Sequence, residues 1–99
     1  MTTKFMFIRN AKGHPVGCMA YRIGNSTMEF EVSTHNPADP FDKALGRFVA
    51  EGRLNKHPKR IVVTPVNDLL REAMVYLMAD PVVPERLKRA MNKRLAREF

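Results

Sequence analysis

Three strand-like segments joined by short turns occupy the first third of the chain, and they constrain the fold more than any other feature. They cover Lys4–Arg9, Val16–Arg22 and Thr27–Thr34. The residues between them are dense in Asn, Gly, Ser and Pro, which favour tight turns. Turns this short join antiparallel neighbours, because parallel strands need a crossover of about a dozen residues or more. The sequence therefore predicts an antiparallel meander of three strands.

The third segment, Thr27–Thr34, alternates between apolar and polar side chains. Alternation with a period of two predicts one buried face and one solvated face. The residues expected on the buried face are Met28, Phe30 and Val32, and those expected on the solvated face are Glu29, Glu31 and Ser33.

The first segment, Lys4–Arg9, is apolar on both faces. Phe5 and Phe7 lie on one face, and Met6 and Ile8 lie on the other. We therefore expect a strand that is covered on both sides, or that is covered on one side and open to a partner on the other. In the second case the strand is a candidate edge for a homodimer or for another protein.

An amphipathic helix is expected after the third strand. Asp39 is a suitable N-cap, Pro40 fits the first helical position, and Gly52 and His57 supply stop signals. Its apolar residues follow the i, i+3, i+4, i+7, i+8 template and are expected to face the core. They are Phe41, Ala44, Leu45, Phe48 and Val49.

A short buried strand and two more helices complete the chain. The strand is expected over Arg60–Thr64, and Pro65 ends it. The second helix is expected from about Val66 to Ala79, and the third begins at Pro84. The apolar face of the second helix consists of Val66, Leu69, Leu70, Ala73, Met74, Leu77 and Met78.

The element order is therefore β-β-β-α-β-α-α, in a single domain that spans residues 1–99. Such a chain buries its apolar stripes by packing helices against a sheet in two layers. We expect an α+β fold with a three- or four-stranded, mainly antiparallel sheet and with the helices packed on one face. The sequence leaves the position of the fourth strand in the sheet open.

Residues 84–99 are expected to form a basic C-terminal helix. They hold six cations and two carboxylates, which is +4 of the formal charge of +7. Their apolar residues make a narrow stripe that is expected to dock on the second helix, so most of the circumference can meet an acidic partner. The stripe consists of Leu87, Ala90, Met91 and Leu95. The cations are Arg86, Lys88, Arg89, Lys93, Arg94 and Arg97.

Other cations can extend this surface. They lie on the first helix, away from its apolar stripe, and in the loop that follows. If the fold brings these segments together, one continuous basic surface results. The helix contributes Lys43, Arg47 and Arg53, and the loop contributes Lys56, Lys59 and Arg60.

A basic surface of this kind attracts polyanions, and nucleic acid is the partner that we expect. The chain has no Trp and only two Tyr, whereas reading bases in single strands needs aromatic platforms. We therefore expect contact with the nucleic-acid backbone and weak sequence selectivity, with DNA and RNA both open. The alternative is an inhibitor or adaptor that binds an acidic host protein, through the same surface or through the Met-rich second and third helices. A membrane partner is not expected, because the tail lacks a broad apolar face.

Residues suited to metal binding or catalysis are few. The three histidines and Cys18 match no metal signature, and the five scattered glycines form no phosphate loop. Asp39 and Asp42 are expected to serve as helix caps. No metal, cofactor or enzymatic activity is therefore expected. A lone Cys and the absence of a signal-like segment favour a cytoplasmic location.

Two segments, FIRNAKGHPVGCMAY and HNPADPFDKALGRFVAEGRL, add a resemblance. Together with the compact plan, they resemble the small uncharacterised proteins that tailed bacteriophages encode among their accessory genes. The resemblance covers roughly the first 55 residues and includes no catalytic signature. It implies a role in host takeover or counter-defence in the host-cell cytoplasm, by binding nucleic acid or by blocking a host factor.

Overall fold

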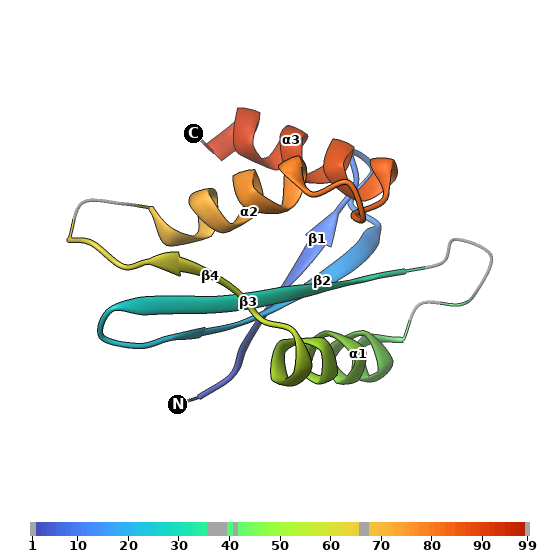
Figure 1. Cartoon of the computed structure of the whole chain (residues 1–99). Coiled ribbons are helices and arrows are strands. Elements are labelled where there is room, and N and C mark those ends of the chain that lie inside the picture. Colours follow the sequence, from blue (N-terminus) through green and yellow to red (C-terminus); the bar gives the residue numbers. More distant parts are fainter. Residues whose placement is uncertain (1, 36–39, 41, 66–67, 99) are drawn as a thin grey trace.

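A computed structural model describes residues 2–35, 40, 42–65 and 68–98, and it contains a four-stranded sheet and three helices (Figure 1). The sheet order is β1-β2-β3-β4, and each neighbouring pair is antiparallel. The α+β class, the antiparallel sheet and the order β-β-β-α-β-α-α are confirmed. The elements are β1 (Lys4–Arg9), β2 (Pro15–Ile23), β3 (Thr27–Thr34), α1 (Lys43–Lys56), β4 (Lys59–Val62), α2 (Leu69–Ala79) and α3 (Glu85–Glu98).

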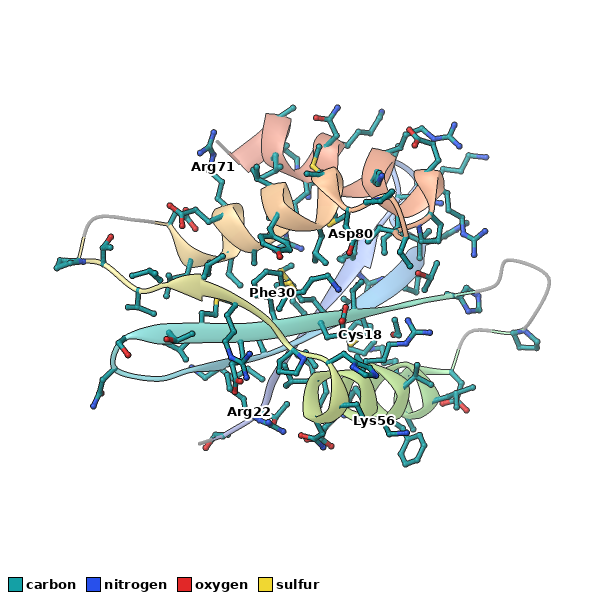
Figure 2. All side chains as sticks on the ribbon, in the orientation of Figure 1. Cys18, Arg22, Phe30, Lys56, Arg71 and Asp80 are labelled. Atoms are coloured by element: carbon teal, nitrogen blue, oxygen red, sulfur yellow. The ribbon has the colours of Figure 1, made fainter. Side chains whose placement is uncertain are left out.

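The helices cover both faces of the sheet, so the prediction that they pack on one face is wrong. In Figure 1, α1 lies below the sheet, and α2 and α3 lie above it. On β2, Cys18 and Ala20 pack with α1, whereas Met19 between them packs with α2 and α3. Figure 2 places Cys18 on the α1 side and Phe30 on the α2 side. The two layers that we expected are therefore three.

This arrangement changes the environment of the polar face of β3. Glu31 and Ser33, which were expected to be solvated, are only 7% and 5% exposed. Helix α1 packs over this face, and the Glu31 carboxylate is also bound by Lys59 of β4 at 2.8 Å. The Ser33 hydroxyl donates a hydrogen bond to the carbonyl oxygen of Gly46 in α1 at 2.9 Å, so its buried polar group is satisfied.

The apolar residues of β1 pack on both faces of the sheet. This is the first of the two alternatives that the sequence left open, a strand covered on both sides. Phe5 and Phe7 pack against the α1 layer, and Met6 and Ile8 join the core under α2 and α3. Both apolar faces of the strand are thus covered within this chain.

Helix α1 presents a different face to the sheet from the one that its periodicity predicts. Its buried residues are Ala50 and Leu54, whereas Leu45 is 58% exposed and Phe48 is 76% exposed. The helix also begins later than expected, because the cap is Asp42, whose side chain accepts a hydrogen bond from the Leu45 N–H. The predicted cap, Asp39, and Phe41 of the predicted stripe lie outside the described residues.

The second half of the chain follows the sequence pattern more closely. Strand β4 pairs with β3 from Thr27 to Phe30, which places the fourth strand at the sheet edge. Helix α2 starts after the cap Asp68 and buries Ala73, Met74 and Leu77. Its predicted start, Val66, lies outside the described residues. Within the part of the chain that the structure covers, no helix has the length and apolar character needed to cross a membrane.

Candidate nucleic-acid interface

Helix α3 docks through the apolar stripe that its spacing predicts. Leu87, Ala90 and Met91 are buried, and Leu95 is partly buried against the same core. The stripe contacts α2, as expected, and also β1 and β2. Docking along this one line fixes which side of the basic helix faces outward.

A groove of about 730 Å³ lies between the second half of α3 and the turn that joins β1 to β2. Five of its nine lining residues are cations, and among the described residues none of the lining side chains is a carboxylate. The two walls come from opposite ends of the sequence. The lining consists of Arg9, Asn10, Ala11, Lys12, Gly13, Lys93, Arg94, Ala96 and Arg97.

The turn that forms one wall is closed by local hydrogen bonds. The Asn10 side-chain oxygen accepts from the backbone N–H groups of Lys12 (2.9 Å) and His14 (3.0 Å). The Gly13 N–H donates to the Asn10 carbonyl, and Gly13 has a φ of 83°, which glycine adopts without strain. The Arg9 guanidinium donates to the Gly13 carbonyl at 3.0 Å. These bonds hold the turn, with Arg9 and Lys12 on it, in one conformation.

The other wall is a regular helix with cations on its outer side. Lys93 and Arg97 are one turn apart, a rise of about 6 Å along the axis, and both are exposed. Arg94 lines the same groove and is partly buried. The positions of these positive charges along the wall are therefore determined by the geometry of the helix.

The remaining predicted cations of α3 lie outside the groove lining. Arg86 donates from Nη2 to the carbonyl oxygen of His35, which ties the start of α3 to the end of β3. Lys88 is one of the positive charges that help to lower the pKa of Asp80. Arg89 is exposed on the helix surface. The six predicted contact residues of the tail thus divide into three groove residues and three others.

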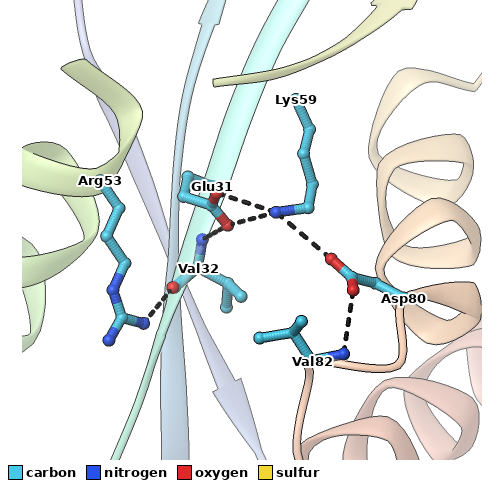
Figure 3. Close-up of polar contacts among 6 residues, drawn as sticks. All are labelled: Glu31, Val32, Arg53, Lys59, Asp80 and Val82. Atoms are coloured by element: carbon cyan, nitrogen blue, oxygen red, sulfur yellow. Dashed lines mark hydrogen bonds and ion pairs between the residues drawn. The ribbon is translucent and has the colours of Figure 1, made fainter. Parts of the chain in front are cut away.

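The cations of α1 interact with the sheet. Lys43 Nζ lies 5.6 Å from the centre of the Phe7 ring, and the Arg47 guanidinium lies over both Phe5 (6.0 Å) and Phe7 (5.6 Å). Such cation–π contacts stabilise the pairs. The Arg53 Nη1 donates to the Val32 carbonyl oxygen at 2.8 Å (Figure 3).

Helices α1 and α3 lie on opposite faces of the sheet, so their cations do not form the one continuous surface that the sequence suggested. Two further cations, which the sequence placed in the loop after the first helix and the structure places in β4, do not extend this surface either. Lys59 pairs with Glu31, and Arg60 pairs with Glu29 at 3.0 Å. Nearby carboxylates therefore offset both of these charges.

Lys59 lies at the centre of a small ionic network (Figure 3). Its Nζ is 2.8 Å from Glu31 Oε2 and 3.3 Å from Asp80 Oδ2. Burial disfavours the ammonium, but the hydrogen bonds and charges of Glu31 and Asp80 outweigh this effect and raise the pKa of Lys59. The pKa of Asp80 is lowered, first by the Val82 N–H that donates to it and also by Lys59. These pairs hold elements together and are not exposed contact sites.

Two groove residues, Arg9 and Lys12, were not predicted as contacts. The sequence did contain a local signal, because both flank a turn rich in Asn and Gly. Nothing in the local pattern, however, places that turn beside α3. Its position follows from the docking of α3 against β1 and β2.

The structure also describes the one cysteine. Cys18 is 1% exposed, and burial raises the pKa of its thiol to about 11, although the nearby Arg47 charge acts in the opposite direction. The thiol is therefore protonated at neutral pH, whereas a nucleophilic cysteine must be a thiolate. Among the described residues, no group of three or more His, Cys, Asp or Glu side chains is arranged to hold a metal ion.

Comparison with known proteins gives no further guide to this site. No family model matches the sequence, and no match was found among the curated proteins or the solved structures.

Proposed function

We propose that this protein binds the phosphate backbone of nucleic acid in the groove between α3 and the β1–β2 turn. The observation that carries the proposal is the convergence of Arg9, Lys12, Lys93, Arg94 and Arg97 on one groove. Arg guanidinium groups form paired hydrogen bonds with phosphate oxygens, and Lys adds a mobile point charge. The excess of cations over the whole chain supports the same partner through its long-range field.

The number of groove cations sets a quantitative expectation. Five phosphate contacts on a duplex correspond to a slope of about −4.5 in log affinity against log salt concentration. Affinity should therefore fall by about 500-fold between 50 and 200 mM salt. Backbone contacts carry no base information, so sequence preference should be weak.

The test is a fluorescence anisotropy titration of labelled DNA and RNA at 50 and 200 mM salt. The groove variant is Lys12→Glu/Lys93→Glu, which alters one exposed cation on each wall. The matched control is Lys4→Glu/Lys56→Glu, which makes the same change in charge at exposed positions outside the groove lining. Figure 2 shows Lys56 at the α1 side of the molecule.

We expect the groove variant to bind at least tenfold more weakly than the wild type at 50 mM salt, and the control to retain most of the affinity. Equal losses in both variants would mean that net charge, and not the groove, accounts for binding. Absence of binding to DNA and RNA at low salt would rule out the proposal.

A second candidate is an inhibitor or adaptor that binds an acidic host protein, in the accessory phage role that the resemblance implies. The exposure of Leu45 and Phe48 on α1 favours it, because adjacent exposed apolar side chains are typical of protein contact surfaces. Capture of one acidic protein from host lysate, abolished by Phe48→Ser and insensitive to nuclease, would support this candidate.

A further inference from the structure

We propose that the basic groove selects double-stranded over single-stranded nucleic acid. This inference rests on the proposed function, because it names the form of nucleic acid that the same groove takes. Two features of the groove carry it: the fixed arrangement of its cations and the lack of an aromatic platform among its described lining residues.

Both walls of the groove are ordered before any ligand binds. Helix α3 is fixed by buried Leu87, Ala90 and Met91. The turn is fixed by the two hydrogen bonds that the Asn10 side chain accepts and by the Gly13 N–H bond. A fixed array of charges suits a partner whose own charges are fixed, because little conformational entropy is then lost on binding.

A duplex is such a partner, and a single strand is not. The phosphates of a duplex lie on a stiff lattice, with one negative charge for about each 1.7 Å of axis. A single strand offers fewer phosphates per unit length and must be ordered when it binds. Its binding proteins offset that cost by stacking bases on aromatic side chains.

The described lining residues of the groove offer no such way to offset the cost of ordering a single strand. Among the described residues, none of the lining side chains is aromatic. In the part of the chain that the structure describes, the most exposed aromatic side chain is Phe48, which lies on α1 at the opposite face of the sheet. Tyr76 on α2 packs edge-to-face against Phe30, with ring centres 5.4 Å apart. A single strand in the groove would therefore gain charge contacts without stacking.

The first experiment compares affinities of the full chain for a 20-base-pair DNA duplex, the matching RNA duplex and the single strand of each. We expect at least one duplex to bind tenfold or more tightly than its single strand at 50 mM salt. Single strands that bind as tightly as both duplexes, with binding still weakened by Lys12→Glu/Lys93→Glu, would overturn the inference and leave the proposed function standing. Failure of every probe to bind would remove both.

A second experiment introduces an aromatic side chain into the groove, on which a base can stack. Ala96 is exposed and lines the groove, so Ala96→Tyr places an aromatic ring there. Since stacking of one base is worth about fivefold or more in affinity, we expect single-strand binding to rise by that factor. Duplex binding should change less than twofold, and Ala96→Leu should change neither. A folded Ala96→Tyr variant without a gain for single strands would overturn the inference.

Phe99 lies outside the described residues, so the first comparison is repeated with Phe99→Ala. We expect the same preference for duplex. Loss of that preference in the variant would also overturn the inference, because the selectivity would then depend on an aromatic side chain and not on the cationic walls.

Discussion

The ammonium of Lys59 lies 2.8 Å from the carboxylate of Glu31, which is buried on the face of the sheet under α1. Both carboxylate oxygens accept from Lys59 Nζ, and Oε1 also accepts from the Val32 N–H at 3.0 Å. Through Asp80, the same ammonium reaches the C-terminal end of α2. One lysine at the start of β4 thus links β3 with the C-terminal end of α2 (Figure 3).

Removing this cation should destabilise the fold. Lys59→Met leaves the Glu31 carboxylate buried without its counter-charge, and loss of one partner of a fully buried pair costs about 3–5 kcal/mol. Lys59 is 22% exposed, so solvent screens part of the effect and we expect about 2 kcal/mol. Urea unfolding followed by circular dichroism measures the free energy. Arg60→Met is the control, because the Arg60 side chain is 60% exposed in its pair with Glu29, and this pair should contribute less than about 0.5 kcal/mol. Equal effects of the two substitutions would contradict the assigned role of Lys59.

Asp80 should contribute to stability in a way that depends on pH. Its pKa is lowered in the folded protein from the ordinary 3.8, chiefly by the Val82 N–H. A depressed carboxyl pKa stabilises the fold above the unfolded-state value, and this contribution is lost as the pH falls through the folded-state value. Wild type should therefore be more stable than Asp80→Asn at pH 7, and the difference should shrink as the pH falls below 3.8 and disappear below the folded-state pKa. Thermal unfolding of both proteins from pH 2 to pH 7 measures this difference. A constant difference over that range would count against the linkage.

Arg53 should act in stability and not in binding. Strand β4 pairs with β3 only as far as Phe30, and the Val32 carbonyl beyond this point accepts a hydrogen bond from Arg53. Arg53→Met removes that donor and should cost about 1 kcal/mol. Nucleic-acid affinity should change less than twofold, since Arg53 lies on α1 and outside the groove. Urea unfolding and anisotropy test the two statements separately. A tenfold loss of affinity with unchanged stability would show that Arg53 is a contact residue.

Replacing two glycines by alanine should change the stability of the fold in opposite directions. A Cβ at Gly17 would lie 2.7 Å from Leu87 Cδ1 and 2.7 Å from the Ser33 carbonyl oxygen, so β2, β3 or α3 must shift. We expect Gly17→Ala to cost about 1–3 kcal/mol. At Gly52 in α1 no atom lies within 4 Å of the added Cβ, and alanine should stabilise the helix by about 0.5–1 kcal/mol. An unchanged or raised melting temperature of Gly17→Ala would contradict the close packing of β2 against α3.

The periodicity of α3 predicted its buried side, whereas that of α1 did not. Helix α3 has a single line of apolar residues, and burying that line leaves Arg89, Lys93 and Arg97 exposed. Helix α1 faces small residues on the sheet, where a Cβ added at Gly46 would lie only 3.7 Å from Cys18 Cβ. Close approach through Gly46 and Ala50 brings Lys43 and Arg47 over the rings of β1. The larger side chains of Leu45 and Phe48 then point outward.

Only part of the candidate site could be predicted from the sequence. The basic character of α3 can be read from residues that are close in sequence, and so can the turn with Arg9 and Lys12. Their meeting in one groove depends on contacts between the two ends of the chain. The prediction that Lys43, Arg47 and Arg53 belong to the same surface is wrong, because α1 packs on the opposite face of the sheet.

By itself, the sequence determined the α+β class, the order of the elements, the antiparallel meander and the docking line of α3. These follow from the spacing of side chains within a segment and from turn residues, which act over a few positions. Only the tertiary structure decided that helices cover both faces and that α1 exposes Phe48. It also decided that the β1–β2 turn forms the second wall of the groove. A strand with two apolar faces can accept a helix on either side, and long-range packing makes that choice.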